Sequence, residues 1–94
     1  MRIIDLILLL NDFNRNNRIY TEINKEKSAV VDLSIEDDGI YLKTSNKLKG
    51  IKNWEFLLLL NKKTYYELPL YYGNKKNHHQ LFGFRVADDC ILLG

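Results

Sequence analysis

The chain resembles itself at an offset of about 50 residues, and this internal similarity restricts its fold more than any other feature. An apolar run that ends in asparagine occurs twice, at Leu6–Asn11 and at Phe56–Asn61. A strand-like alternation that leads into an Asp-Asp pair also occurs twice, at Val31–Leu42 and at Phe82–Leu93. Because self-similarity at a fixed spacing is how repeated structural units appear in a sequence, we expect both halves to share one order of elements.

Two interpretations of this similarity stay open. Either an α-β-β-β unit is duplicated, with repeat units at 1–46 and 52–94, or Leu-rich runs match by chance. In both cases the 94 residues are too few for two independent hydrophobic cores, so a single domain over 1–94 is expected.

The first half is predicted to form one helix followed by three strands. Apolar residues over Ile3–Phe13 have helical spacing and cover most faces of the helix. The strands are predicted at Arg18–Ile23, Ala29–Ile35 and Gly39–Thr44. Since aspartate and glycine accept the positive φ of tight hairpins, Asp37, Asp38 and Gly39 predict a hairpin turn.

The second half is less regular. Its apolar run Trp54–Leu60 fits either a short helix or a buried strand, and the analogy with the first half favours the helix. Tyr65–Tyr72 is expected to be extended and confined to an edge by Pro69, which cannot donate to a ladder. A polar loop at Gly73–His79 precedes a second hairpin, predicted at Leu81–Ala87 and Cys90–Leu93. Together, these predicted elements indicate a two-layer α+β fold, with one or two short helices packed on a mostly antiparallel sheet.

The composition excludes several classes of protein. A net charge of +2, from 14 basic and 12 acidic residues, is weakly basic for a dedicated nucleic-acid-binding domain. Cys90 is the single cysteine, so an internal disulfide is excluded and a reducing compartment is expected. The apolar runs are too short to cross a bilayer, so no membrane contact is expected and the cytoplasm is the expected location.

No sequence motif for catalysis or metal binding stands out. His78 and His79 are adjacent, so a strand would point them to opposite faces, and no further ligands stand at a familiar spacing. The pairs Asp37–Asp38 and Asp88–Asp89 would bind a divalent ion if the two hairpin ends met, but turn residues are the simpler interpretation. Cys90 lacks a neighbouring base and is interpreted as a small buried or half-buried side chain. We therefore expect no enzymatic activity, no metal and no cofactor.

The tyrosines are the best functional lead. Alternate residues of an extended segment point to opposite faces, so both faces of Tyr65–Tyr72 cannot be buried without hiding Glu67. Tyrosine offers a large apolar area at low entropic cost, which explains its enrichment in protein interfaces. The sequence thus predicts a partner-binding surface formed by Tyr65, Tyr66, Glu67, Tyr71, Tyr72, Lys75 and Lys76. The alternative, that these are ordinary residues of an amphipathic sheet, stays open.

The N-terminal pattern carries a resemblance to a class of proteins. Met1–Leu10, followed by Phe13-Asn14 and a strand at Ile19, resembles short phage and prophage proteins that open with M-x-[VI]-x-D-L-I-x-x-L. The richness in Asn, Lys, Ile and Tyr is similar to AT-rich phage coding, and a small chain without catalytic motifs looks like the anti-defence proteins that include anti-CRISPRs. The resemblance implies a non-catalytic inhibitor that binds a host defence complex in the host cytoplasm. That class shares no common motif, so it assigns no residue here.

Two other functions stay open beside a host-protein partner. A small single-stranded nucleic-acid-binding domain would stack bases on the tyrosines and place lysines such as Lys47, Lys49 and Lys52 on the phosphates. A homo-oligomer, such as a homodimer that binds a small ligand, would cover the apolar helix faces with a second subunit.

Overall fold

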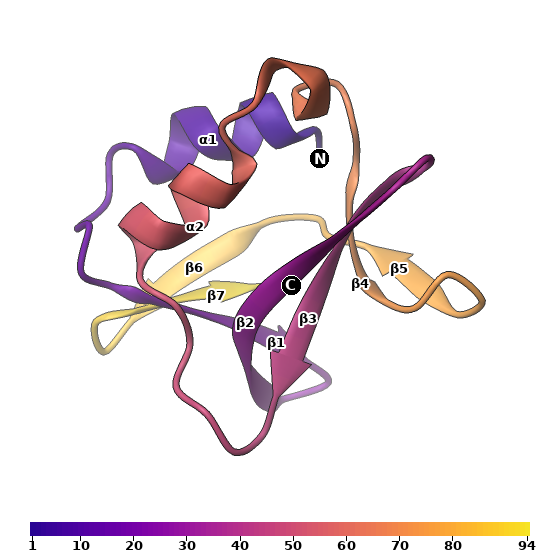
Figure 1. Ribbon diagram of the computed structural model, residues 1–94. Helices are drawn as coiled ribbons and strands as arrows, with labels where there is room; N and C mark the ends of the chain where they lie inside the picture. The colour runs from indigo at the N-terminus through magenta and orange to yellow at the C-terminus, as the bar shows by residue number, and fades with distance from the viewer.

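The structure is a computed structural model that describes all residues from 1 to 94. Figure 1 shows two helices side by side on one side of a strongly curved sheet. The helices are α1 (Ile3–Leu10) and α2 (Asn53–Leu60), and a 3-10 turn follows at Lys63–Tyr65. The strands are β1 (Arg18–Ile23), β2 (Glu26–Glu36), β3 (Gly39–Ser45), β4 (Leu70–Gly73), β5 (His78–Gln80), β6 (Phe84–Ala87) and β7 (Cys90–Leu93). The predicted α+β fold is confirmed, and neither helix is long and apolar enough to span a membrane.

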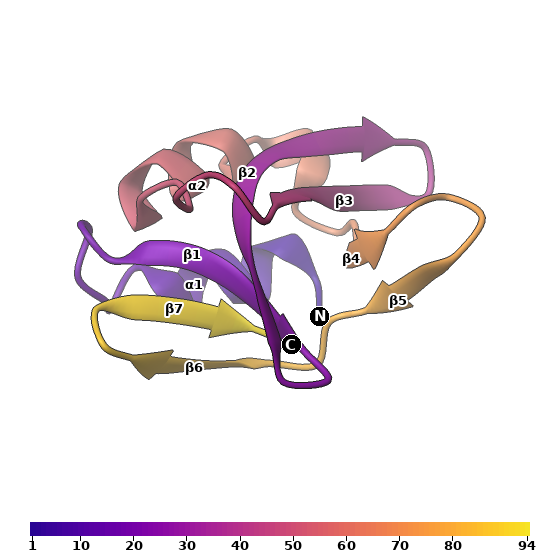
Figure 2. The ribbon, with the colours of Figure 1, turned by 90° about the horizontal axis from the view of Figure 1, so that it is seen from below.

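All seven strands belong to one sheet, in the order β5-β4-β3-β2-β1-β7-β6. Neighbouring strands are antiparallel with two exceptions: β3 runs parallel to β4, and β1 runs parallel to β7. These are the two places where a strand of the first half pairs with a strand of the second half. β2 pairs with β1 over residues 26–29 and with β3 over residues 29–36, and Figure 2 shows it crossing between the two sides of the curved sheet. β5 and β6 follow each other in the chain but form the two edges, so the chain itself closes the curve.

The two halves make the same strand pairings at an offset of 51 residues. Ile35 pairs with Ile40 in the β2–β3 hairpin, and Val86 pairs with Ile91 in the β6–β7 hairpin. The β1–β2 and β4–β5 registers are related by the same offset, and so are the two parallel pairings. The continuous strand β2 thus corresponds to the separate strands β5 and β6. The strand pairing of the first half is therefore repeated in the second half. That the two halves arose by duplication of one unit stays a prediction.

The helices join the halves into one structure. Each helix begins by donating a backbone N–H to the other half: Ile3 to the Leu68 carbonyl at 2.9 Å, and Asn53 to the Asn17 carbonyl at 2.7 Å. Fourteen buried apolar residues from both halves form one cluster. Phe56 and Leu6 are fully buried in it at equivalent positions of the two helices. The cluster is therefore shared and cannot be divided between the halves.

The favoured helix at Trp54–Leu60 is confirmed, but several other predicted bounds are wrong. The strand predicted at Ala29–Ile35 is longer and runs from Glu26 to Glu36, because its first residues pair with β1. α1 ends at Leu10 rather than Phe13, because the chain turns there and Phe13 N–H bonds the Leu10 carbonyl. The extended segment predicted at Tyr65–Tyr72 is a strand only from Leu70. Its first part bends because the carbonyls of residues 66 and 68 accept the first N–H groups of α1.

The bounds predicted around the second hairpin also need correction. The loop predicted at Gly73–His79 contains the end of β4 and the start of β5, so the connection between these strands is reduced to residues 74–77. The strand predicted at Leu81–Ala87 begins only at Phe84. Before it, Leu81 is buried in the core and donates its N–H to the Leu70 carbonyl at 3.3 Å, while Phe82 and Gly83 both donate to the Gly94 carbonyl at the end of the chain.

The Asp-Asp turns differ from the prediction in their backbone conformation. Positive φ is found at Asp88 (51°) and Asp89 (63°), but not at Asp37 or Asp38. Gly39 has no positive φ either, and it is required for another reason. A Cβ atom there would lie 2.6 Å from Tyr71 Cε2 and 2.9 Å from the Pro69 carbonyl oxygen. Close approach of the neighbouring strand therefore selects the glycine.

Candidate functional site

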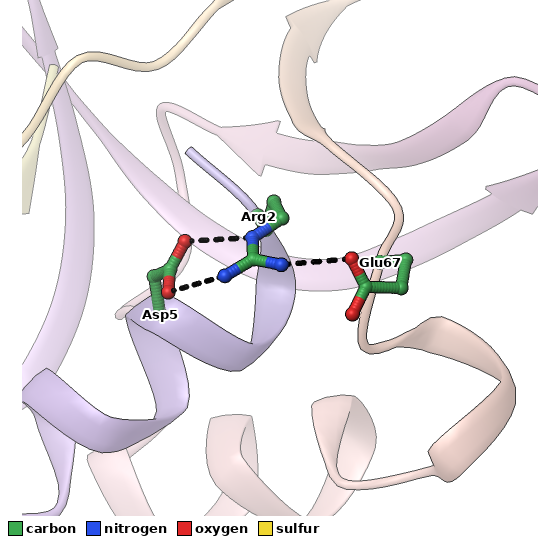
Figure 3. Close-up of polar contacts among 3 residues, drawn as sticks. All are labelled: Arg2, Asp5 and Glu67. Atoms are coloured by element: carbon green, nitrogen blue, oxygen red, sulfur yellow. Dashed lines mark hydrogen bonds and ion pairs between the residues drawn. The ribbon is translucent and has the colours of Figure 1, made fainter.

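Two of the first three residues of the predicted tyrosine surface contact the start of α1: the Tyr66 carbonyl accepts the Ile4 N–H at 3.0 Å, and Glu67 pairs with Arg2. The Tyr66 hydroxyl donates to Asn61 Oδ1 at 2.6 Å, while Tyr65 packs against the core. Glu67 is exposed and accepts a hydrogen bond of 2.8 Å from Arg2 Nη1. Figure 3 shows the Arg2 guanidinium between the carboxylates of Glu67 and Asp5. The hydrogen bond from Arg2 lowers the pKa of Asp5 below its ordinary value.

Tyr71 and Tyr72 are neighbours in β4 and contact different partners. The Tyr71 ring meets Tyr41 at 5.2 Å and His78 at 4.6 Å between centroids. The Tyr72 ring stacks on His79 at 5.1 Å and also packs against the core. Both rings are half-buried, so cross-strand packing occupies much of their apolar area. The two histidines, predicted in a loop, are strand residues that pack on tyrosines.

Tyr41 is almost fully buried beside this aromatic group. Its hydroxyl donates to Asp38 Oδ2 at 2.9 Å. Burial, with a further contribution from this hydrogen bond, raises the pKa of Tyr41 to about 12. A hollow of about 210 Å³ beside Tyr41 is lined by lysines and a glutamate, Lys43, Lys75 and Glu36 among them. Its mixed charges favour no single class of ligand.

Lys75 and Lys76 lie in the exposed connection between β4 and β5. This connection is held by the Asn74 side chain, whose Oδ1 accepts the Lys76 N–H at 3.0 Å and the Asn77 N–H at 2.8 Å. The structure therefore does not gather the seven predicted residues on one exposed face. Tyr66 and Glu67 contact the start of α1, and Tyr65 packs against the core. The two strand tyrosines pack on their neighbours, and the lysines lie apart from them in the connection.

The structure contains no group of three or more His, Cys, Asp and Glu side chains placed to hold a metal ion. Figure 1 shows that the β2–β3 and β6–β7 turns, which carry the Asp-Asp pairs, lie on opposite sides of the molecule. The two Asp-Asp pairs are therefore too far apart to share one ion. Cys90 is half-buried as predicted, and its Sγ lies 3.7 Å from Lys27 Nζ.

A groove centred on Trp54, which the sequence reasoning missed, is the most exposed apolar feature of the helices. Leu58 is 67% exposed and Trp54 is 37% exposed, both on α2. The groove has a volume of about 430 Å³ between α2 and β2. It is lined by Val31, Asp32, Ile51, Trp54, Glu55, Leu58 and Leu59. A second hollow, of about 280 Å³, lies between Trp54, Arg15 and Leu57, so the indole stands between two hollows. We call the larger one the Trp54 groove.

The groove exists because the connector before α2 enters the sheet. Ile51 bridges β1 and β2, since its carbonyl accepts the Ile19 N–H at 2.8 Å and its N–H donates to the Val30 carbonyl at 2.9 Å. A side chain at Gly50 would overlap the Ile19 carbonyl oxygen, so a glycine is required there. Beyond this point β2 leaves β1, with a register irregularity between Val30 and Asp32. The space so opened lies between β2 and α2.

One sequence signal could have indicated this surface. The run Trp54–Leu60 is apolar on nearly every face, yet a short helix lying on a sheet buries only one side. Some of its leucines therefore had to face solvent or a partner. No protein-family model, curated protein or solved structure matches the chain.

Proposed function

We propose that this chain is a non-catalytic protein-binding module that contacts its partner through the Trp54 groove. The observation that carries the proposal is the exposure of Leu58 and Trp54 at the rim of an apolar hollow. Exposed apolar patches with a polar rim are typical of interaction surfaces, and tryptophan is enriched among the residues that dominate binding. Covering these side chains with a partner would remove apolar area from water, which favours association.

The partner class that we propose is a host defence complex, which the protein would inhibit by direct binding. Support for this class comes from the N-terminal resemblance to short phage and prophage proteins. The predicted tyrosine surface is the competing location for the contact. It is less favoured because the Tyr66 hydroxyl and the rings of Tyr71 and Tyr72 already have partners within the chain.

The experiment is affinity capture from cells of the organism that carries the gene, using the wild-type chain and two matched variants. Leu58 and Leu8 occupy equivalent helix positions and are 67% and 62% exposed, so both substitutions to serine remove a similar exposed side chain. We expect Leu58→Ser to lower the amount of the specific partner by about tenfold or more, as for a residue at the centre of an interface. Leu8→Ser should retain it.

The captured partner is then purified, and its dissociation constant is measured with each variant. Equal binding by wild type and Leu58→Ser would contradict the proposal. Loss of binding in Tyr72→Ala together with full binding by Leu58→Ser would assign the contact to the tyrosine surface instead. Thermal unfolding of each variant verifies that its fold is retained.

A further inference from the structure

We infer that the Trp54 groove takes an extended, basic segment of the partner, which adds as a strand to the free edge of β2. This inference rests on the proposed function and names the chemistry of the partner segment. Strand addition to an exposed sheet edge is a common way to bind a peptide, because the backbone supplies affinity and pockets for alternate side chains supply specificity.

The first argument is the set of backbone groups that β2 leaves unpaired. Ile35 stands opposite Ile40 in the hairpin, and the Ile40 N–H donates to the Pro69 carbonyl at 3.0 Å, away from β2. Two residues that stand opposite each other in antiparallel strands point their backbone N–H and C=O groups either both toward the partner strand or both away from it. The N–H and C=O of Ile35 therefore point away from β3, to the outer edge of β2. β1 pairs with β2 only as far as Ala29. No strand of this chain therefore covers residues 33–36 of β2 on that side.

The free edge is short and lies next to the groove. At about 3.3 Å per residue, residues 33–36 span about 13 Å, which is enough to pair with a segment of four or five residues. The Leu33 N–H is occupied by Asp32 Oδ1 at 2.8 Å, and Asp32 also lines the groove. Successive side chains of an added strand would point alternately toward Trp54 and Leu58 and toward solvent.

The second argument is charge. Two carboxylates and no basic side chain line the groove, Asp32 on the β2 side and Glu55 on α2. Residues 31–38 of β2 and its turn carry three more carboxylates and no basic side chain, although Glu36 lines the hollow beside Tyr41 instead. The nearby cations are Lys43, which stands opposite Asp32 on β3, Lys52, which precedes α2, and Arg15, which lines the hollow on the other side of Trp54. Carboxylates outnumber cations, so an approaching lysine or arginine is attracted and an acidic segment is repelled. The segment is thus expected to alternate apolar residues with lysine or arginine.

The test is selection of a displayed library of random linear peptides on the wild-type chain, with counter-selection on Leu58→Ser. We expect enriched peptides that alternate apolar and basic residues. The best peptide is then synthesised with N-methyl groups at alternate backbone amides. Methylation of the amides that face β2 should weaken binding by about tenfold or more, whereas methylation of the other amides should not.

Two proline variants of the protein supply a matched control. Ile35 and Val86 are equivalent positions, each 43% exposed, on the outer edges of the two hairpins. Proline removes a backbone N–H at such an edge position without breaking a ladder hydrogen bond. Ile35→Pro should weaken the peptide by about tenfold or more, and Val86→Pro should leave its affinity unchanged.

Enrichment of helical or acidic peptides would overturn the inference, as would binding that is insensitive to N-methylation and to Ile35→Pro. A dimer of the wild-type chain that dissociates in Leu58→Ser, measured by light scattering, would assign the groove to a second copy and also overturn it. If no peptide is selected but partner capture still depends on Leu58, the inference fails while the proposed function stands. If capture does not depend on Leu58, the proposed function fails as well.

Discussion

The two halves of the molecule share their strand pairing but present different surfaces. The helices correspond at an offset of 50 residues, which places Ile4 at the position of Trp54 and Leu8 at that of Leu58. Leu8 and Leu58 are similarly exposed, yet a groove forms only beside α2. There β2 continues without a break over 11 residues, whereas its counterpart divides into β5 and β6. The shared pairing maintains the fold, and the proposed binding surface lies where the halves differ.

A similar contrast is found at the hairpin turns. Gly39 and Cys90 are equivalent residues, each the first of the returning strand. Gly39 is enclosed by Tyr71 and the Pro69 carbonyl, while Cys90 has room for a side chain that approaches Lys27. Equivalent backbone positions can therefore have opposite steric requirements, because different side chains stand on the neighbouring strand.

The largest effect is expected from the equivalent core residues Phe56 and Leu6. Phe56→Ala should lower the free energy of unfolding by about 3–5 kcal/mol, and Leu6→Ala by about 2–5 kcal/mol, because each leaves a cavity in the shared core. Both variants should unfold in one cooperative transition, measured in urea by Trp54 fluorescence and by circular dichroism. The milder Phe56→Leu applies if the alanine variant does not fold. Separate midpoints for the two signals would mean that the halves are independent.

A smaller effect is expected at the turns. Gly39→Ala should destabilise the protein by about 1–3 kcal/mol, because the new methyl group meets the Pro69 carbonyl and forces the strands apart. Cys90→Ala at the equivalent position is the control and should change the free energy of unfolding by much less. Equal effects in urea titrations of the two variants would contradict the steric difference between the turns.

The smallest effect concerns two exposed ion pairs that the other half does not reproduce. Arg2 lowers the pKa of Asp5, and Arg85 lowers the pKa of Glu22, each chiefly through side-chain hydrogen bonds. A carboxyl whose pKa is lower in the folded state stabilises the fold above its ordinary value, here 3.8 for Asp5 and 4.5 for Glu22. This contribution is lost as the pH falls through the folded pKa.

Asp5→Asn and Glu22→Gln should each reduce the loss of stability in acid by a small amount, since both pairs are exposed and solvent screens them. Urea titrations at a series of acidic pH values measure this slope. The difference from wild type should shrink at high salt, because salt screens exposed charges. A slope that is identical in all three proteins at low salt would show that the ion pairs do not contribute.

Much of the fold could be predicted because its causes are local in sequence. The alternation of Val31, Leu33 and Ile35 indicated a strand, and the spacing from Ile3 to Leu10 indicated a helix. Periodicity alone left Trp54–Leu60 ambiguous between helix and strand, and the analogy with the first half indicated the helix. Periodicity and internal similarity are both visible in a single sequence.

The features that could not be predicted have causes far away in the chain. The bend at residues 66–69 is imposed by the first N–H groups of α1, more than 60 residues earlier. The requirement for Gly39 comes from Tyr71, and the Trp54 groove depends on Ile51 bridging β1 and β2. The tyrosines were chosen for their chemistry, but their partners His78, His79 and Asn61 are set by tertiary contacts.

The most direct test compares both halves in a single titration. Amide and indole resonances of the isotope-labelled protein are followed by nuclear magnetic resonance while the selected basic peptide is added. The account predicts that the amides of residues 33–36 and the Trp54 indole N–H shift with one dissociation constant, while those of Phe84–Ala87 and α1 stay in place. Shifts at the equivalent edge of β6, or at both edges alike, would contradict the claim that binding belongs to the surface where the halves differ.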